Sequence, residues 1–170
     1  MRTEQYKWIL LIALVFSLMG ISGCETMHTR IVIPAEPEAV WSVLTDTEKY
    51  HEWNPVFIKA EGDIVEGATL NYQFIDPNNP EAEPVDMETE VVRVVKPSLL
   101  KQKAGTPGIL TADHEYRLQP VEGGTEVIQH EEDRGIALLF WDASWVEPAY
   151  QKALDALKER VISIQESKAQ

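Results

Sequence analysis

Residues 31–46 of this chain, IVIPAEPEAVWSVLTD, decide how its fold begins. The apolar run ahead of Pro34 predicts a β-strand over residues 28–34. Pro37 then favours the first turn of a helix, because the N–H that proline lacks would have no partner at that position. The apolar face of this short helix consists of Val40, Trp41, Val43 and Leu44. The chain therefore passes from a strand directly into an amphipathic helix.

The next part of the chain predicts a second short helix and six strands. A helical segment near residues 47–53 ends before Pro55, since the residue that precedes a proline is disfavoured in helices. Alternating apolar and polar residues between clusters of Gly, Pro and Asn then indicate strands. These strands cover residues 56–60, 69–75, 87–95, 99–104, 110–118 and 125–134. Gly123-Gly124 lies between the last two strands and is typical of a tight hairpin.

The end of the chain predicts one long helix. Apolar residues recur at helical spacing from Tyr150 to Ile164 and form a single stripe. The whole order predicts an α+β fold, in which a curved antiparallel sheet wraps around the long C-terminal helix and two short helices follow the first strand. A sheet wrapped in this way can leave a hollow beside the helix, which is a natural place for a ligand.

Three stretches carry a resemblance to a known family: residues 31–34 with 37–46, residues 50–55 (Tyr-His-Glu-Trp-Asn-Pro), and His114-Glu115-Tyr116 with Gly123-Gly124-Thr125. In this order they resemble the START-like (SRPBCC) superfamily, which includes polyketide cyclases, lipid-transfer domains and the birch-pollen allergen. The resemblance spans roughly residues 28–166. It implies a helix-grip fold that binds a hydrophobic molecule; some members are enzymes and many are not. The chain departs from the common pattern at the polar Gln102 and in the enlarged loop 76–84.

The N-terminus predicts export and lipid attachment. Basic Arg2 and Lys7 precede an apolar run over residues 8–21, which is shorter than the ~20 residues of a bilayer span. The residues Ile21-Ser22-Gly23-Cys24 resemble the lipobox of bacterial lipoproteins. That resemblance implies a diacylglycerol on the Cys24 thiol, cleavage before it, and usually acylation of the new amino terminus. The alternative is an ordinary secretory signal followed by a chance cysteine.

We therefore predict three parts: a signal peptide at 1–23, a lipidated cysteine with a short tether at 24–27, and a START-like domain at 28–168. At ~3.3 Å per extended residue, the tether would hold the domain within roughly 15 Å of the bilayer. The expected location is the bacterial cell envelope, lipid-anchored and extracytoplasmic. Glu25 is not the usual inner-membrane retention residue, which favours the outer membrane if the bacterium is Gram-negative.

Composition excludes several classes of partner. The chain of 170 residues carries a net charge of −13, and residues 24–170 carry −14 because the signal contributes +1. Such a surface repels nucleic acids and anionic headgroups. The single cysteine rules out an internal disulfide. The four histidines lack the spacing of metal ligands, so we predict no metal and no cofactor.

The hairpin suggests which side chains face inward. If Gln119 faces Glu126, then Tyr116 faces Gln129 and His114 faces Glu131, so that these last four share one face of the sheet. The opposite face is too charged to be the inner one; it carries Asp113, Glu115, Arg117, His130, Glu132 and Arg134. A slip of one residue would reverse the assignment.

We predict a ligand site of inward polar and aromatic residues. Its members are Trp53, Leu70, Tyr72, Phe74, Gln102, His114, Tyr116, Gln129, Glu131, Trp145 and Tyr150. His114 and Glu131 are also candidate acid–base residues, unless they satisfy each other or meet water at the cavity mouth. The apolar run over residues 136–141 is expected to be buried against the helix; the alternative is an exposed patch that faces a membrane or lipid.

The leading hypothesis is a membrane-anchored, extracytoplasmic protein that binds a small hydrophobic or amphipathic ligand without catalysis. The ligand would be lipid-like or an aromatic metabolite. One alternative is an enzyme like a polyketide cyclase or dehydratase that uses His114 and Glu131. The other is an interaction module of the cell envelope with a filled cavity, which an enclosed volume well below ~300 Å³ would favour.

Overall fold

A single antiparallel sheet of seven strands forms most of the fold, in the order β1-β7-β6-β5-β4-β3-β2. The structure is a computed structural model, and it describes residues 23–79 and 81–169. The elements are β1 (Gly23–Ile33), α2 (Pro37–Leu44), η1 (Thr47–Glu52), β2 (Phe57–Glu61), β3 (Thr69–Phe74), β4 (Val85–Val95), β5 (Leu99–Thr106), β6 (Leu110–Val121), β7 (Gly124–Gly135), η2 (Ile136–Leu139) and α3 (Val146–Lys168).

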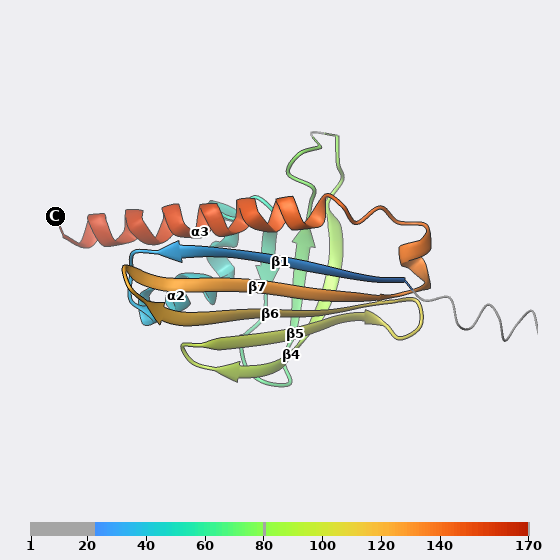
Figure 1. The fold of residues 1–170 in the computed structure, drawn as a ribbon, viewed down its shortest axis with the longest axis horizontal. Coiled ribbons are helices and arrows are strands. Elements are labelled where there is room, and N and C mark those ends of the chain that lie inside the picture. Colours follow the sequence, from blue (N-terminus) through green and yellow to red (C-terminus); the bar gives the residue numbers. More distant parts are fainter. Residues whose placement is uncertain (1–22, 80, 170) are drawn as a thin grey trace, which may run out of the picture.

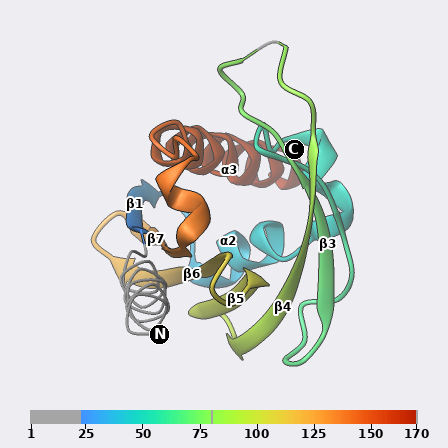
Figure 2. The same ribbon diagram turned by 90° about the vertical axis from the view of Figure 1, so that its right-hand side faces the viewer.

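The sheet curves around α3, as predicted. Figure 1 shows α3 lying along β1 and β7, and Figure 2 shows the sheet bending from β1 round to β3 with α3 in its hollow. The two short helices α2 and η1 follow β1 directly. The α+β arrangement and the element order expected from the sequence are therefore confirmed.

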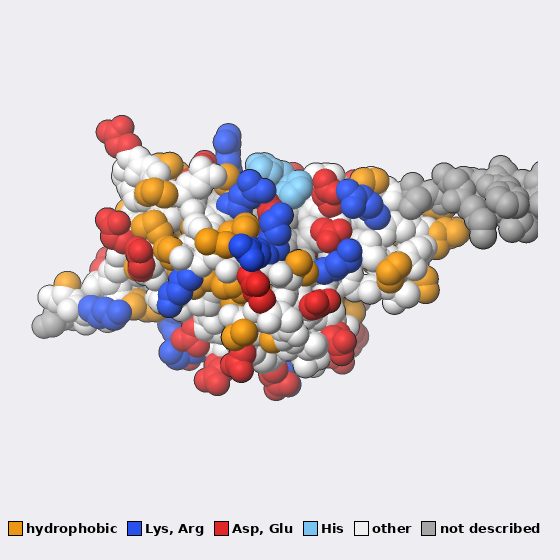
Figure 3. Space-filling model, turned by 90° about the horizontal axis from the view of Figure 1, so that it is seen from below, with side chains coloured by type: hydrophobic (Ala, Val, Ile, Leu, Met, Phe, Trp, Pro, Cys, Tyr) orange, Lys and Arg blue, Asp and Glu red, His pale blue; other side chains and the backbone are white. Residues whose placement is uncertain are grey.

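The register predicted for the hairpin is also confirmed. Gln119 pairs with Glu126, Tyr116 with Gln129, and His114 with Glu131. The turn contains Gly123, whose φ of +90° is a conformation that glycine adopts without strain. The inner-face set is buried, and most of the opposite face carries mixed charges in contact with solvent (Figure 3).

Strand β1 begins earlier than predicted. Residues 24–27, which we expected to form a tether, belong to the strand, and Cys24 pairs with Arg134 of β7. The reason is that β7 extends to Gly135 and offers backbone partners over the whole length of β1. Cys24 is a free, exposed cysteine. Residues 1–22, with most of the predicted signal peptide, lie outside the described residues.

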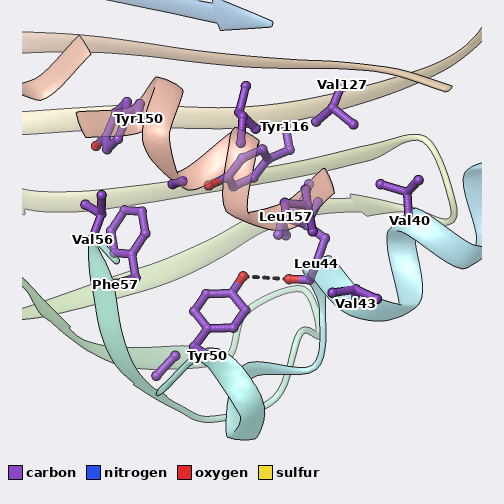
Figure 4. Close-up of a cluster of buried hydrophobic side chains, with 14 of the residues drawn as sticks. Val40, Val43, Leu44, Tyr50, Val56, Phe57, Tyr116, Val127, Tyr150 and Leu157 are labelled. Atoms are coloured by element: carbon purple, nitrogen blue, oxygen red, sulfur yellow. Dashed lines mark hydrogen bonds between the residues drawn. The ribbon is translucent and has the colours of Figure 1, made fainter. Parts of the chain in front are cut away.

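Helix α3 buries the predicted stripe. Tyr150, Ala153, Leu154, Leu157 and Val161 are all buried against the sheet and α2. Full burial of a leucine contributes about 1.5–3 kcal/mol, so this stripe holds the helix in place. Figure 4 shows Tyr150 and Leu157 pointing into the same core as side chains from the other elements.

The apolar run after β7 is not buried against α3, so that expectation was wrong. Ile136 and Leu139 of η2 are exposed, and Phe140 is 87% exposed. The buried stripe of α3 is already covered by the sheet, and α3 begins only at Val146, so most of this run has no apolar surface to pack on. No helix among the described residues is both long and apolar enough to cross a bilayer.

Candidate functional site

A groove of about 500 Å³ lies between the start of α3 and the inner face of the sheet. Its volume is within the range of small-molecule sites, roughly 300–1,000 Å³. Only the first two turns of α3 contribute to it, through Val146 and Tyr150. The apolar and aromatic lining consists of Phe57, Phe74, Val85, Met87, Ala104, Ile109, Leu110, Ala112, Trp141, Trp145, Val146 and Tyr150.

A larger hollow lies elsewhere but has a different character. It measures about 820 Å³ and lies beside η1 and β2, among exposed charged residues such as Glu48 and Asp63. Ligand sites are mostly apolar with a few placed polar groups. The groove beside α3 fits that description better, and we treat it as the candidate site.

Aromatic rings build two walls of the groove. Phe74 stacks on Trp145 with ring centroids 5.7 Å apart, and Trp141 meets Trp145 edge-on at 6.5 Å. On the other side, Phe57 stacks on Tyr150 at 5.9 Å. Each such pair contributes roughly 0.5–1.5 kcal/mol beyond its burial, so the walls are preformed.

A chain of polar side chains lies behind the groove. Gln102 Nε2 donates to Tyr72 Oη at 2.8 Å, and Gln102 Oε1 lies 3.4 Å from His114 Nδ1. Gln129 Nε2 lies 3.0 Å from His114 Nε2. An amide donor at Nε2 and a carbonyl acceptor at Nδ1 fit one neutral tautomer, with the proton on Nδ1.

His114 is neutral, and side chains contact both of its ring nitrogens. Burial lowers the pKa of His114 to about 3, so the ring is neutral near pH 7. Both ring nitrogens are engaged by Gln102 and Gln129, although Glu131 is the direct register partner of His114. The two residues predicted as an acid–base pair are therefore neighbours whose polar atoms bond to other groups.

Two carboxyl groups of β7 face the groove. Tyr150 Oη donates to Glu131, with both carboxyl oxygens 2.9 Å away. Burial, reinforced by the nearby Asp133, raises the pKa of Glu131 to about 8. Burial and the charge of Glu25 raise the pKa of Asp133 to about 6. Near pH 7, Glu131 is mostly protonated and Asp133 mostly ionised.

A smaller cavity of about 20 Å³ extends the groove towards the polar chain. It shares Phe57, Ala104 and Glu131 with the groove and reaches Gln102 and His114. Its volume has room for about one water molecule. The polar chain is therefore at the inner end of the site and not at its mouth.

The predicted site residues separate into three groups. Phe74, Glu131, Trp145 and Tyr150 line the groove. Tyr72, Gln102 and His114 line the smaller cavity. Trp53, Leu70, Tyr116 and Gln129 line neither of these two spaces; Leu70, Tyr116 and Gln129 are buried, and Trp53 is partly buried against the core.

Several lining residues were missed by the sequence analysis, above all Phe57, Met87 and Asp133. Asp133 lies two residues after Glu131, so the alternation of the strand could have assigned it to the inner face. Among the described residues, no group of three or more His, Cys, Asp or Glu side chains is arranged to hold a metal ion.

Comparison with known proteins gives a family and a fold. The family model described as "Polyketide cyclase / dehydrase and lipid transport" matches residues 25–161. No curated protein sequence matches the chain.

Solved structures with the same fold are numerous and distant in sequence. A Staphylococcus aureus protein of unknown function is 14% identical, with a TM-score of 0.65, and the match covers 85% of this chain and 98% of that one. Norcoclaurine synthase from Thalictrum flavum, solved with dopamine and hydroxybenzaldehyde, is 13% identical, with a TM-score of 0.61 and coverage of 85% and 90%. Ara h 8.0201 is 12% identical, with a TM-score of 0.63 and coverage of 83% and 99%. These likenesses confirm the helix-grip fold.

Proposed function

Because the chain belongs to the polyketide cyclase / dehydrase and lipid transport family, we propose that it binds a small hydrophobic or amphipathic molecule in the groove beside α3. The molecule is lipid-like or an aromatic metabolite, and it is bound without chemical change. The protein is held on the outside of a bacterial membrane by lipids on Cys24. The observation that carries the binding proposal is the groove of about 500 Å³ with its largely apolar, aromatic lining.

Burial of apolar ligand surface supplies the affinity. Each Å² of apolar surface removed from water contributes about 25 cal/mol. The stacked pairs Phe74–Trp145 and Phe57–Tyr150 are rigid walls for such a surface. Because these rings already pack on one another, little ordering is needed when a ligand binds.

The geometry supports binding over catalysis. An acid–base role for His114 needs a ring nitrogen that reaches the ligand. Both nitrogens are instead engaged by glutamine side chains, and the carboxyl group of Glu131 is held by Tyr150. The polar set behind the groove therefore positions side chains and satisfies buried groups.

An exposed apolar rim supports a membrane-facing orientation. We define the rim as Ile109, Ile136, Leu139 and Phe140, all of which are exposed. Ala137 N–H donates to the Ile109 carbonyl at 3.0 Å, so the η2 segment lies directly against the loop that carries Ile109. Ile109 also lines the groove. Figure 3 shows hydrophobic side chains at this end of the molecule.

The lipid attachment point would be at the same end. Gly23 pairs with Gly135, the residue before η2, and the side chain of Leu138 is close to Gly23. Lipids on Cys24 would therefore bring the rim against the bilayer. Exposed Phe and Leu side chains are stabilised at that boundary. With no free tether residues, the groove would open at the membrane surface.

A photo-crosslinking experiment in cells tests the proposed binding. Val85 lines the groove and is exposed, so a diazirine-bearing amino acid at this position would point at a bound molecule. Val121, an exposed valine at the hairpin end of β6, is the matched control. We expect a discrete small-molecule adduct on peptides that contain position 85 and none at position 121. Equal labelling at both positions, or none at 85, would contradict the proposal.

A further inference from the structure

We propose that the groove selects ligands that carry a positively charged nitrogen, an organic ammonium group bound between Asp133, Glu131 and the aromatic walls. This inference rests on the proposed function, because it names the chemical class of the molecule that the groove binds. It follows from three features of the lining: its charges, an unpaired carboxylate oxygen, and its aromatic rings.

The carboxyl side chains of the lining have no basic counterpart among the described residues. Glu131 and Asp133 are two residues apart on β7, so their side chains share the inner face about 7 Å apart. Asp86 of β4 also borders the groove, but its carboxylate accepts a hydrogen bond from Gln73 Nε2 at 2.9 Å and does not add to the inner-face charge. Within the described part of the chain, no Lys or Arg contributes to this lining. An anionic ligand would meet only repulsion here, and a cation would be attracted.

Asp133 has a buried oxygen without a partner. The residue is 3% exposed, and its Oδ1 makes no hydrogen bond among the described residues. A buried carboxylate that lacks a donor or counter-ion is unfavourable by several kcal/mol. A bound ammonium group would supply both the charge and the missing hydrogen bond.

On the outer face of the same sheet, a buried carboxylate is paired with cationic side chains. Glu115 is also buried, at 7% exposure, but Lys101 lies 2.6 Å from its Oε2 and Arg117 contacts its other oxygen. These cations hold the pKa of Glu115 below its usual value against the effect of burial. Asp133 has no such neighbour among the described residues. Asp133 on the inner face can therefore pair with a cationic group of a ligand.

Aromatic rings line the same groove as the two carboxyl groups. The lining contains Trp141, Trp145, Phe74, Phe57 and Tyr150. A cation over the face of such a ring gains roughly 0.5–2 kcal/mol, with tryptophan the strongest. The groove therefore combines aromatic rings with carboxyl side chains. This combination matches an organic cation better than a fatty acid or a neutral lipid.

The titratable groups around the site make the binding dependent on pH. They are Glu25 on β1, Asp86 on β4, His114 on β6 and Tyr150 on α3, besides the two carboxyls themselves. Burial keeps His114 neutral, so it adds no competing positive charge. Because the pKa of Asp133 is about 6, its negative charge is present at pH 8 and mostly lost at pH 5.

Three matched probes test the proposal: 4-phenylbutylamine, 4-phenylbutanol and 5-phenylpentanoate, which share a phenyl ring and four methylenes and differ only in the head group. Each is titrated calorimetrically into the full chain in lipid nanodiscs, and the heat from empty nanodiscs is subtracted. At pH 8 we expect the amine to bind at least about tenfold more tightly than the alcohol and the carboxylate. At pH 5 the affinity for the amine should fall about tenfold, since one pH unit below a pKa leaves about a tenth of the group ionised.

Isosteric variants assign the effect to the inner face. Asp133→Asn should weaken binding of the amine about tenfold and leave the alcohol within twofold. Glu131→Gln is the second inner-face variant, and Asp113→Asn is the control because Asp113 lies on the outer face beside Lys103 and Arg134. An alcohol that binds as tightly as the amine, or an Asp133→Asn variant with unchanged preference, overturns the charge selection and leaves the groove proposal intact. If none of the three probes binds, the proposed groove function fails as well.

Discussion

Tyr150 of α3 donates a hydrogen bond to Glu131 of β7, with both carboxyl oxygens 2.9 Å from the phenol oxygen. This contact ties the first turns of the long helix to the sheet at the inner end of the groove. Tyr150 also stacks on Phe57, so one side chain forms part of a wall and fixes a carboxyl group. The position of α3 and the state of Glu131 are therefore coupled.

Removal of the Tyr150 hydroxyl should destabilise the domain without reshaping the groove. In Tyr150→Phe the ring still packs on Phe57, but Glu131 loses its donor. A buried polar group left without its partner costs about 1–3 kcal/mol of unfolding free energy. Urea unfolding of the two proteins at pH 7 measures this difference. Equal unfolding midpoints would mean that the hydrogen bond does not hold the helix.

Glu131 should make the protein less stable as the pH rises. Its pKa is about 8 in the folded protein and near 4.5 when unfolded. The folded state therefore holds the proton that the unfolded state has lost, and the stabilisation present below pH 4.5 disappears as the pH rises through 8. For His114, whose folded pKa is about 3 against 6.5 unfolded, stability is instead lost as the pH falls below 6.5.

The effects of Glu131 and His114 oppose each other between pH 4.5 and 6.5, and the raised pKa of Asp133 adds to that of Glu131 up to about pH 6. Above pH 6.5 mainly the effect of Glu131 remains. We expect the unfolding free energy to decline by about 2 kcal/mol between pH 6.5 and 8, at 1.36 kcal/mol per pKa unit. Glu131→Gln should remove this decline. Chemical unfolding at a series of pH values checks it, and an identical slope in the variant would refute the assignment to Glu131.

Removing one side chain from the hydrogen-bonded polar residues behind the groove should lower the unfolding free energy. Gln102→Leu leaves Tyr72 Oη without its donor and His114 Nδ1 without its acceptor. We expect a loss of about 2–4 kcal/mol, since each buried orphan costs about 1–3. The matched control is Gln119→Leu, an exposed glutamine on β6 that should stay within about 0.5 kcal/mol. If thermal or urea unfolding shows equal losses of unfolding free energy in both variants, the buried hydrogen bonds of Gln102 do not stabilise the protein as described.

Cys24→Ala should release the protein from the membrane or block its processing. The side chain is exposed and free for acylation. Thr26→Ala, at the next exposed outward position of β1, is the control and should remain membrane-bound. Fractionation of cells followed by intact-mass measurement distinguishes the forms. If the Cys24→Ala protein is cleaved and still remains in the membrane fraction like the wild-type protein, lipid attachment at this residue is rejected.

Local patterns were sufficient to predict most of the fold. The alternation on β6 and β7 and the glycines of their turn predicted the pairing of His114 with Glu131. The start of β1 could not be predicted in the same way, because Cys-Glu-Thr-Met is a weak strand sequence. It is a strand because the distant β7 supplies partners. The exposure of Phe140 likewise depends on where α3 begins.

The candidate site could be predicted only in part, because it too depends on how distant segments pack. Inward direction follows from the alternation of side chains along a strand, and it placed Glu131 and Phe74 on the inner face, where both line the groove. Which inward residues meet the groove depends on how far α3 fills the hollow. Leu154, Leu157 and Val161 fill one half, so Tyr116 and Gln129 beneath them are core. The groove remains only beside Val146 and Tyr150.

Native mass spectrometry of the full chain, expressed in a bacterium and purified from its cells, tests the central claim most directly. The account predicts a non-covalent adduct of discrete mass on the protein. The adduct should be lost when Ala112→Phe fills the groove and be retained in Arg117→Ala, which changes the outer face. A bare protein mass, or an adduct that Ala112→Phe leaves unchanged, would contradict a ligand in the groove.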